Sequence, residues 1–157
     1  SAGAMLNFLP AIVFLIACGL AFATGTSWGT FGILIPITLK VFPLESGNPL
    51  AIICVSACMA GAVCGDHCSP ISDTTIMSSA GAQCDHIAHV STQMPYALSC
   101  ALISFLTYVV AGFVQNALIS LAVGAALLLA MMSVLHFAQQ RAENPLTGAE
   151  AGKEIAG

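Results

Sequence analysis

Charged residues are scarce in this sequence, and their scarcity excludes a soluble globular protein. Of the 157 residues, three are Lys or Arg and seven are Asp or Glu, which together make 6% of the chain. A soluble globular domain carries about 25% charged residues, which it needs to cover its water-facing surface. Hydrophobic residues make up 58% of this chain. The composition therefore predicts an integral membrane protein.

Other absences narrow the class further. The basic residues are too few to form a patch that would bind nucleic acid. The seven cysteines are an odd number and several lie inside apolar runs, so the sequence does not predict a disulfide framework. The chain begins with Ser1, and no basic segment precedes its first apolar run, which is therefore not typical of a signal peptide. We expect the sequence to be the C-terminal part of a longer polypeptide.

The first apolar stretch, residues 9–42, has an unusual length. A single helix of its 34 residues would be about 51 Å long, whereas the hydrocarbon core of a bilayer is about 30 Å thick. Two full spans would need about 40 residues and a turn. Residues 24–30, which are rich in Gly, Thr and Ser, interrupt the stretch. We expect a re-entrant helical hairpin with these residues at its tip. The alternative is one long tilted helix that is kinked at Pro36.

The second apolar stretch predicts a broken transmembrane helix over residues 49–82. Residues 49–64 contain no charge, and Asn48 and Pro49 are a good helix start. Two carboxylates, an imidazole and several hydroxyls then follow within residues 65–75. Such polar segments persist in a membrane only where they line a cavity or bind something. We expect an unwound middle and a second helical half over residues 74–82.

The remainder of the chain predicts two full spans and a tail. Residues 84–93 are polar and read as an interfacial loop, in which we expect Asp85, His86 and His89 to be solvated. Transmembrane helices follow over residues 94–114 and 117–137, with a tight turn between them. The transmembrane domain is thus expected to cover residues 1–138, and residues 139–157 to form a polar tail. The fold class is all-α and polytopic.

The polar segments offer oxygen atoms, which are the ligands that a hard monovalent cation prefers. The break and the hairpin tip are expected to face one another near the bilayer middle, as in the discontinuous helices of secondary transporters. The expected ion-binding residues come from both segments: Asp66, Ser69, Ser72, Asp73 and Thr74, and Thr26 and Ser27.

The same residues predict proton exchange. Two carboxylates in one confined cavity repel each other, so one of them should hold a proton when no cation is bound. Competition between a proton and a cation for the same oxygens is the minimum chemistry of a cation/proton exchanger. We expect Asp66, Asp73 and His67 to transfer protons. Alternative roles are a helix cap for Asp73 and the orientation of Asp66 for His67.

Three rival functions remain open from the residues alone. Cys64, His67 and Cys68, together with Cys84 or His86, offer nitrogen and sulfur ligands for a zinc site. A hydrolase triad could use the residue types of Ser69, His67 and Asp66, which are neighbours in the sequence. A triad depends on geometry, however, and not on adjacency in sequence. A membrane scaffold that transports nothing is the third, but it gives no reason for two carboxylates in an apolar setting.

Four segments resemble the C-terminal region of NhaC-type Na⁺/H⁺ antiporters: residues 25–32 (GTSWGTFG), 65–75 (GDHCSPISDTT), 84–86 (CDH) and 92–97 (TQMPYA). The resemblance implies a multi-pass transporter of the bacterial inner membrane, and not an enzyme. It implies that sodium and protons are the transported ions, with no other cofactor. Members of this superfamily contain two inverted repeats, so the chain would be the second repeat and would pair with a missing N-terminal one. A homodimer stays open, as does the related class of sodium/proton-coupled malate/lactate antiporters.

Overall fold

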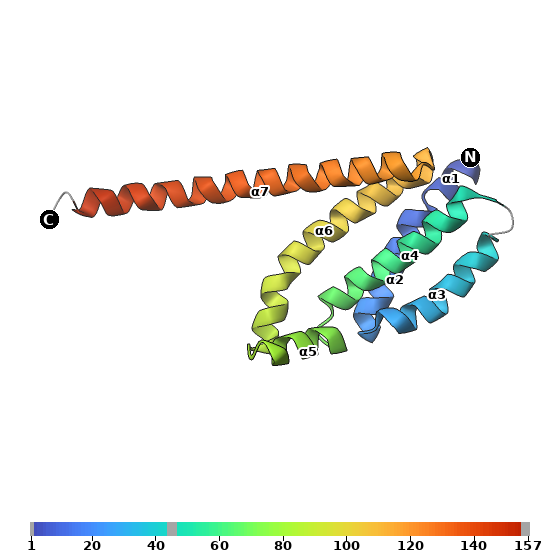
Figure 1. Ribbon diagram of the computed structural model, residues 1–157, viewed down its shortest axis with the longest axis horizontal. Helices are drawn as coiled ribbons and strands as arrows, with labels where there is room; N and C mark the ends of the chain where they lie inside the picture. Colours follow the sequence, from blue (N-terminus) through green and yellow to red (C-terminus); the bar gives the residue numbers. More distant parts are fainter. Residues whose placement is uncertain (1, 44–46, 155–157) are drawn as a thin grey trace.

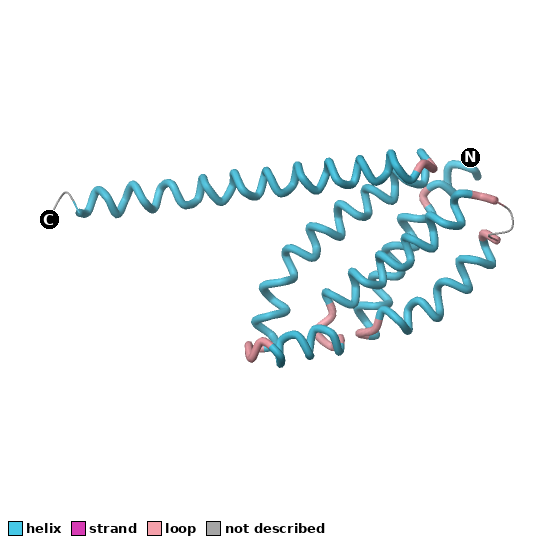
Figure 2. The backbone as a smooth tube through the Cα atoms, in the orientation of Figure 1, coloured by secondary structure: helices cyan, strands magenta, loops and turns pink. Residues whose placement is uncertain are grey.

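The chain is entirely helical in the part that the structure describes. The computed structural model describes residues 2–43 and 47–154, with side chains for residues 5–43 and 47–137. No strand occurs within these residues, which confirms the prediction of an all-α fold (Figures 1 and 2). The helices of the described residues are α1 (Ala2–Asn7), α2 (Leu9–Thr24), α3 (Ser27–Val41), α4 (Pro49–Cys68), α5 (Asp73–Gly81), α6 (His86–Val114) and α7 (Ala117–Glu154).

Residues 9–42 form two short helices and not one long kinked helix. Helices α2 and α3 have 16 and 15 residues, or about 24 and 22 Å. The chain reverses direction between them at Gly25, whose φ of +68° lies in the left-handed region that glycine adopts readily. Figure 1 shows α3 returning alongside α4. The Thr26 side chain then starts α3 by accepting the Gly29 N–H.

Helices α2 and α4 form the core of the molecule. The residues between them are small: Ala17, Ala21, Cys58 and Ala62 make one fully buried cluster. Gly65 lies directly against the Cys18 carbonyl, where a Cβ atom would collide with it. Small residues allow two helix backbones to approach closely, which is how helices commonly associate in membranes. This close contact fixes where the end of α4 lies relative to the end of α2.

The broken helix is present, but its break is shorter and later than predicted. Helix α4 continues through Cys68, so Asp66 and His67 belong to its last turn and not to an unwound segment. Only residues 69–72 are non-helical, because Pro70 disfavours the helical conformation for Ser69. With 20 residues α4 is about 30 Å long, enough to cross a bilayer alone. The length of α4 therefore indicates that the break follows a complete transmembrane span, and not half of one.

Two further predictions about the C-terminal region were wrong. Residues 86–93 are the first turns of α6 and not a loop, since the Asp85 side chain accepts the Ala88 N–H and starts the helix. Residues 139–154 continue α7 and do not form a loose tail, although they include Pro145 and two glycines. The last three residues of the predicted tail lie outside the described part.

The helices fit a membrane protein. Among the described residues, three helices are long and apolar enough to cross a bilayer: α4, α6 and residues Ala117–Phe137 of α7. Helix α6 contains Pro95 and changes direction in its first half (Figure 1). It ends at Gln115, whose φ of 52° reverses the chain into α7. Large apolar side chains are exposed along most helices, as a lipid environment requires.

Candidate functional site

The break between α4 and α5 contacts the turn between α2 and α3. Both segments lie at the same end of the helix bundle (Figure 1). The Ser69 hydroxyl donates a hydrogen bond of 2.8 Å to the carbonyl of Phe22, 47 residues away in sequence. Gly25 packs on the backbone of Ile71, where an added Cβ atom would lie 2.8 Å from the carbonyl oxygen. These two contacts hold the hairpin turn directly against the polar break.

Asp66 is the centre of the site. It is 6% exposed and points into a group of hydroxyls. Ser72 donates a hydrogen bond of 2.8 Å to Oδ1, while the hydroxyls of Ser27 and Thr74 each lie 3.5 Å from Oδ2. Ser72 and Thr74 are also hydrogen-bonded to each other, at 2.8 Å. We call these four residues the Asp66 cluster.

The Asp66 cluster combines one carboxylate with three hydroxyls from three elements. Ser27 comes from the first turn of α3, Ser72 from the break and Thr74 from α5. A hydroxyl can donate its proton to a carboxylate, or rotate and present a lone pair to a cation. A buried carboxylate needs such partners, because its charge is costly without them. The cluster can therefore satisfy Asp66 either with hydroxyl donors or with a cation shared among four oxygen-bearing side chains.

The second predicted carboxylate lies elsewhere. Asp73 is exposed at the first position of α5, and its Oδ1 accepts the N–H of Thr74. The prediction that Asp66 and Asp73 share one confined cavity is therefore wrong. The reason is the helical start at Asp73, which directs this side chain outward while Ser72 turns inward. A carboxylate at this position also stabilises the helix N-terminus.

Three other predicted residues lie next to the cluster and outside it. Ser69 is fully buried and binds the Phe22 carbonyl, so it joins the break to α2. Thr26 starts α3 through its hydroxyl. The His67 side chain is exposed on the last turn of α4, and it makes no hydrogen bond within the part of the chain that carries described side chains. Direct contact with Asp66 is thus made by Ser27, Ser72 and Thr74.

The sequence was compared with known protein families and curated proteins. The profile of the Na⁺/H⁺ antiporter family matches residues 5–113, which is most of the chain. The chain belongs to the Na⁺/H⁺ antiporter family. The matched region contains every residue of the Asp66 cluster. Membership of this family confirms the resemblance to Na⁺/H⁺ antiporters that the sequence motifs indicated.

Several curated relatives of this antiporter chain are known. A Haemophilus influenzae protein of uncharacterised function is 50% identical over 127 residues, 81% of this chain and 24% of its own. The malate-2H⁺/Na⁺-lactate antiporter of Bacillus subtilis is 33% identical over 71% of this chain and 24% of its own. An uncharacterised Na⁺/H⁺ antiporter of Haemophilus influenzae is 36% identical over 67% of this chain and 20% of its own. The chain thus spans about a quarter of the length of these relatives. No solved structure matches it significantly.

Sequence reasoning missed two residues beside the Asp66 cluster. His86 was expected to be solvated, but both of its ring nitrogens are engaged: Nε2 lies 2.7 Å from the Pro70 carbonyl and Nδ1 lies 3.0 Å from the Ser79 hydroxyl. The Gln93 side chain donates a hydrogen bond of 2.8 Å to the carbonyl of His67. Recognition of Asp85 as a helix cap would have placed both residues on one helix beside the break.

The zinc and hydrolase alternatives lack support in this geometry. In the part of the chain that the structure describes, no three His, Cys, Asp or Glu side chains lie close enough to hold a metal ion. Cys84 is exposed, and His86 is bound to Pro70 and Ser79. Ser69 donates to a backbone carbonyl and not to a histidine. The residues near the break therefore do not form a zinc site or a catalytic triad.

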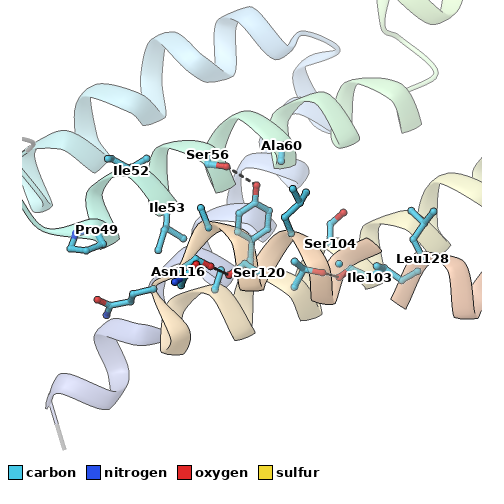
Figure 3. Close-up of a pocket in the computed structure, with 17 residues that line it drawn as sticks. Pro49, Ile52, Ile53, Ser56, Ala60, Ile103, Ser104, Asn116, Ser120 and Leu128 are labelled. Carbon is cyan, nitrogen blue, oxygen red and sulfur yellow. Dashed lines mark hydrogen bonds between the residues drawn. The ribbon is translucent and has the colours of Figure 1, made fainter. Parts of the chain in front are cut away.

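A separate apolar pocket of about 550 Å³ lies between α4, α6 and α7 (Figure 3). The α4 residues that line it lie between Pro49 and Ala60, in the first part of that helix. Asp66 lies at the other end of α4. Inside it, Ser56 and Tyr108 are hydrogen-bonded at 3.0 Å. The pocket is therefore distinct from the Asp66 cluster.

Proposed function

We propose that this chain carries the cation- and proton-binding site of a secondary transporter that exchanges sodium ions for protons. The observation that supports it most is a buried carboxylate, Asp66, surrounded by three hydroxyls from the break, α5 and the opposing hairpin. Family membership supports transport of antiporter type. Four oxygen-bearing side chains and no nitrogen or sulfur donor suit a hard cation such as sodium.

The proposed exchange follows from competition at Asp66. When the carboxylate is ionised, sodium binds its oxygens together with the hydroxyl oxygens of Ser27, Ser72 and Thr74. When Asp66 takes up a proton, it loses the negative charge that holds the cation. The two ions cannot occupy the same oxygens together, so each conformational cycle carries one kind of ion in each direction. Asp73 and His67, exposed at the same end, are proposed to pass protons to and from Asp66.

The remaining predicted features of the transporter belong to this proposal. Ser69 and Thr26 would serve as auxiliary oxygen donors through their positions beside the cluster. The transporter would be of NhaC type and lie in the bacterial inner membrane. A first, inverted repeat outside this chain would complete the ion path, consistent with relatives about three times as long.

Sodium-driven proton movement tests the proposal. The protein, expressed from its complete coding sequence, is reconstituted in vesicles that contain a pH-sensitive dye, and sodium is added outside. We expect internal pH to rise, because sodium that enters is exchanged for protons that leave, and Asp66→Asn to abolish this change because the amide neither takes up a proton nor carries a charge. We also expect Asp73→Asn to slow the exchange.

Asp85→Asn is the matched control. It removes an exposed carboxylate in the same region, yet asparagine still serves as a helix cap. This variant is expected to exchange at the parental rate. Parental rates for both Asp66→Asn and Asp73→Asn would show that the ion site is elsewhere.

A second candidate is an antiporter that couples sodium and protons to carboxylates. It is favoured by the similarity to a protein named malate-2H⁺/Na⁺-lactate antiporter. The Asp66 cluster would bind the sodium ion in both cases, so the cluster alone does not separate them. Uptake of labelled malate or lactate driven by a sodium gradient would support this candidate, and sodium/proton exchange without either carboxylate would exclude it.

A further inference from the structure

We propose that His86 is a positioning residue, which holds the break between α4 and α5 in the shape that brings Ser72 to Asp66. His86 lies at the start of α6 and does not touch the Asp66 cluster. Its ring joins two other segments, the break at Pro70 and the helix α5 at Ser79. The transport readout of this inference rests on the proposed sodium/proton exchange, whereas its structural readout does not.

One hydrogen bond assigns a proton on the imidazole. The Pro70 carbonyl can only accept, so Nε2 must carry a proton and donate. Nδ1 lies 3.0 Å from the Ser79 hydroxyl, which also bonds the Ile76 carbonyl of α5 at 2.9 Å, so the ring is joined to a side chain that is itself held in α5. A ring held at both nitrogens has a fixed orientation. It therefore links α5 and the break with little freedom for either to move.

The break needs such donors because its carbonyls lie beyond the helical hydrogen-bond ladder. The last carbonyls of a helix have no partner within it. Here α6 supplies two side-chain donors, Gln93 to the carbonyl of His67 and His86 to that of Pro70. The two donors are seven residues apart, which places them on the same face of α6. One face of α6 therefore binds the polar end of α4 from the side opposite the hairpin turn.

Pro70 connects this face to the ion site through a very short stretch of chain. On one side of Pro70, Ser69 is bound to the Phe22 carbonyl, and two residues after Pro70, Ser72 is bound to Asp66. The break is thus held by α2 at Ser69 and by α6 at Pro70, and these two supports set where the Ser72 hydroxyl lies. Loss of the His86 contact would release the α6 side and let Ser72 move away from Asp66.

The test compares His86→Ala with a matched neighbour, His89→Ala. His89 is one helical turn further along α6, and its side chain makes no hydrogen bond within the described side chains. In vesicles, we expect His86→Ala to raise the sodium concentration for half-maximal exchange about tenfold, as loss of an outer-shell partner commonly does for metal sites. The maximal rate should change less than about twofold, because Asp66 itself is untouched. His89→Ala should behave like the parent.

His86→Gln separates positioning from loss of the fold. Its amide N–H can donate to the Pro70 carbonyl in place of Nε2, so it should recover most of the lost sodium affinity. If His86→Ala does not reach the membrane, Ser79→Ala removes the partner of Nδ1, together with a bond inside α5 to the Ile76 carbonyl, and should raise half-saturating sodium in the same direction. The proposal would be overturned if the measured variant, His86→Ala or Ser79→Ala, had a lower maximal exchange rate but the parental sodium concentration for half-maximal exchange.

Amide hydrogen exchange gives a readout that does not depend on transport. His86→Ala, or Ser79→Ala in its place, should accelerate exchange of the amides in residues 71–76, whereas His89→Ala should not. If the parent protein moves no protons on addition of sodium, the proposed function fails, and this measurement still decides the role of His86. Equal exchange in the His86 and His89 variants would show that His86 does not hold the break.

Discussion

Ser72 shows how one residue of the site departs from its ordinary local role. A serine at the N-cap of a helix usually accepts an N–H from the first turn. Ser72 occupies that position in α5, yet its side chain makes no capping bond and instead donates to Asp66 and contacts Thr74. The hydroxyl is thus used for the carboxylate, six residues earlier in the chain.

We predict that Ser72→Ala weakens sodium binding and also lowers stability. The variant removes one of the four proposed oxygen ligands, so half-saturating sodium should rise roughly 10- to 100-fold, as loss of a partner at a metal site commonly does. Stability should fall by about 1.5–3 kcal/mol, because the buried Asp66 carboxylate loses its 2.8 Å hydrogen bond. The sodium dependence of proton flux in vesicles measures the effect. Ser78→Ala is the control, since that hydroxyl bonds only to its own helix at the Thr74 carbonyl. Equal half-saturation in the two variants would remove Ser72 from the site.

At the scale of elements, the contact between α2 and α4 positions Asp66. Gly61 and Gly65 lie against the backbone of α2 at Phe14 and Cys18. Because Asp66 directly follows Gly65, the depth of this helix contact sets how far the carboxylate lies from the hairpin that carries Ser27. A larger residue in α4 would move the helices apart and would widen the site as well as weaken the core.

We predict that Gly65→Val destabilises the protein by about 1–3 kcal/mol, the usual cost of an overpacked contact. Its Cβ would collide with the Cys18 carbonyl, which cannot move without shifting α2. The control is Gly19→Ala on α2, where an added Cβ meets nothing within 4 Å. Gly19→Ala should leave the midpoint temperature of thermal unfolding unchanged or raise it slightly, since alanine favours helices. Thermal unfolding of the purified protein in detergent measures both, and equal midpoints would contradict the close contact.

At the scale of the whole molecule, one site for two ions makes sodium affinity depend on pH. Protons and sodium compete for the same oxygens, so half-saturating sodium must rise as pH falls, by at most about tenfold per pH unit when one proton competes with one sodium ion. We expect this trend in equilibrium binding of radioactive sodium to the purified protein. A half-saturation that is constant between about pH 3 and about 9 would contradict competition.

Parts of the architecture follow from local sequence, and the errors have physical causes. The hairpin over residues 9–42 was predictable because its length suits neither one span nor two. The start of α6 was missed because residues 86–93 are polar, and hydropathy alone cannot distinguish a loop from a helix that faces a polar break. The predicted span over residues 117–137 is the apolar part of α7, whereas the helical continuation of α7 was missed because its polar residues were interpreted as a tail.

The sequence by itself determined that the chain is helical and lies in a membrane, and it placed a turn within residues 24–30 and a break within residues 65–75. These features depend on composition and on the backbone preferences of neighbouring residues, which act over a few positions. Only the tertiary structure decided that Ser27 and Ser72 meet Asp66, that Asp73 faces outward and that His86 supports the break. Such contacts join segments up to 39 residues apart at the Asp66 cluster, and they depend on how closely α2 and α4 pack.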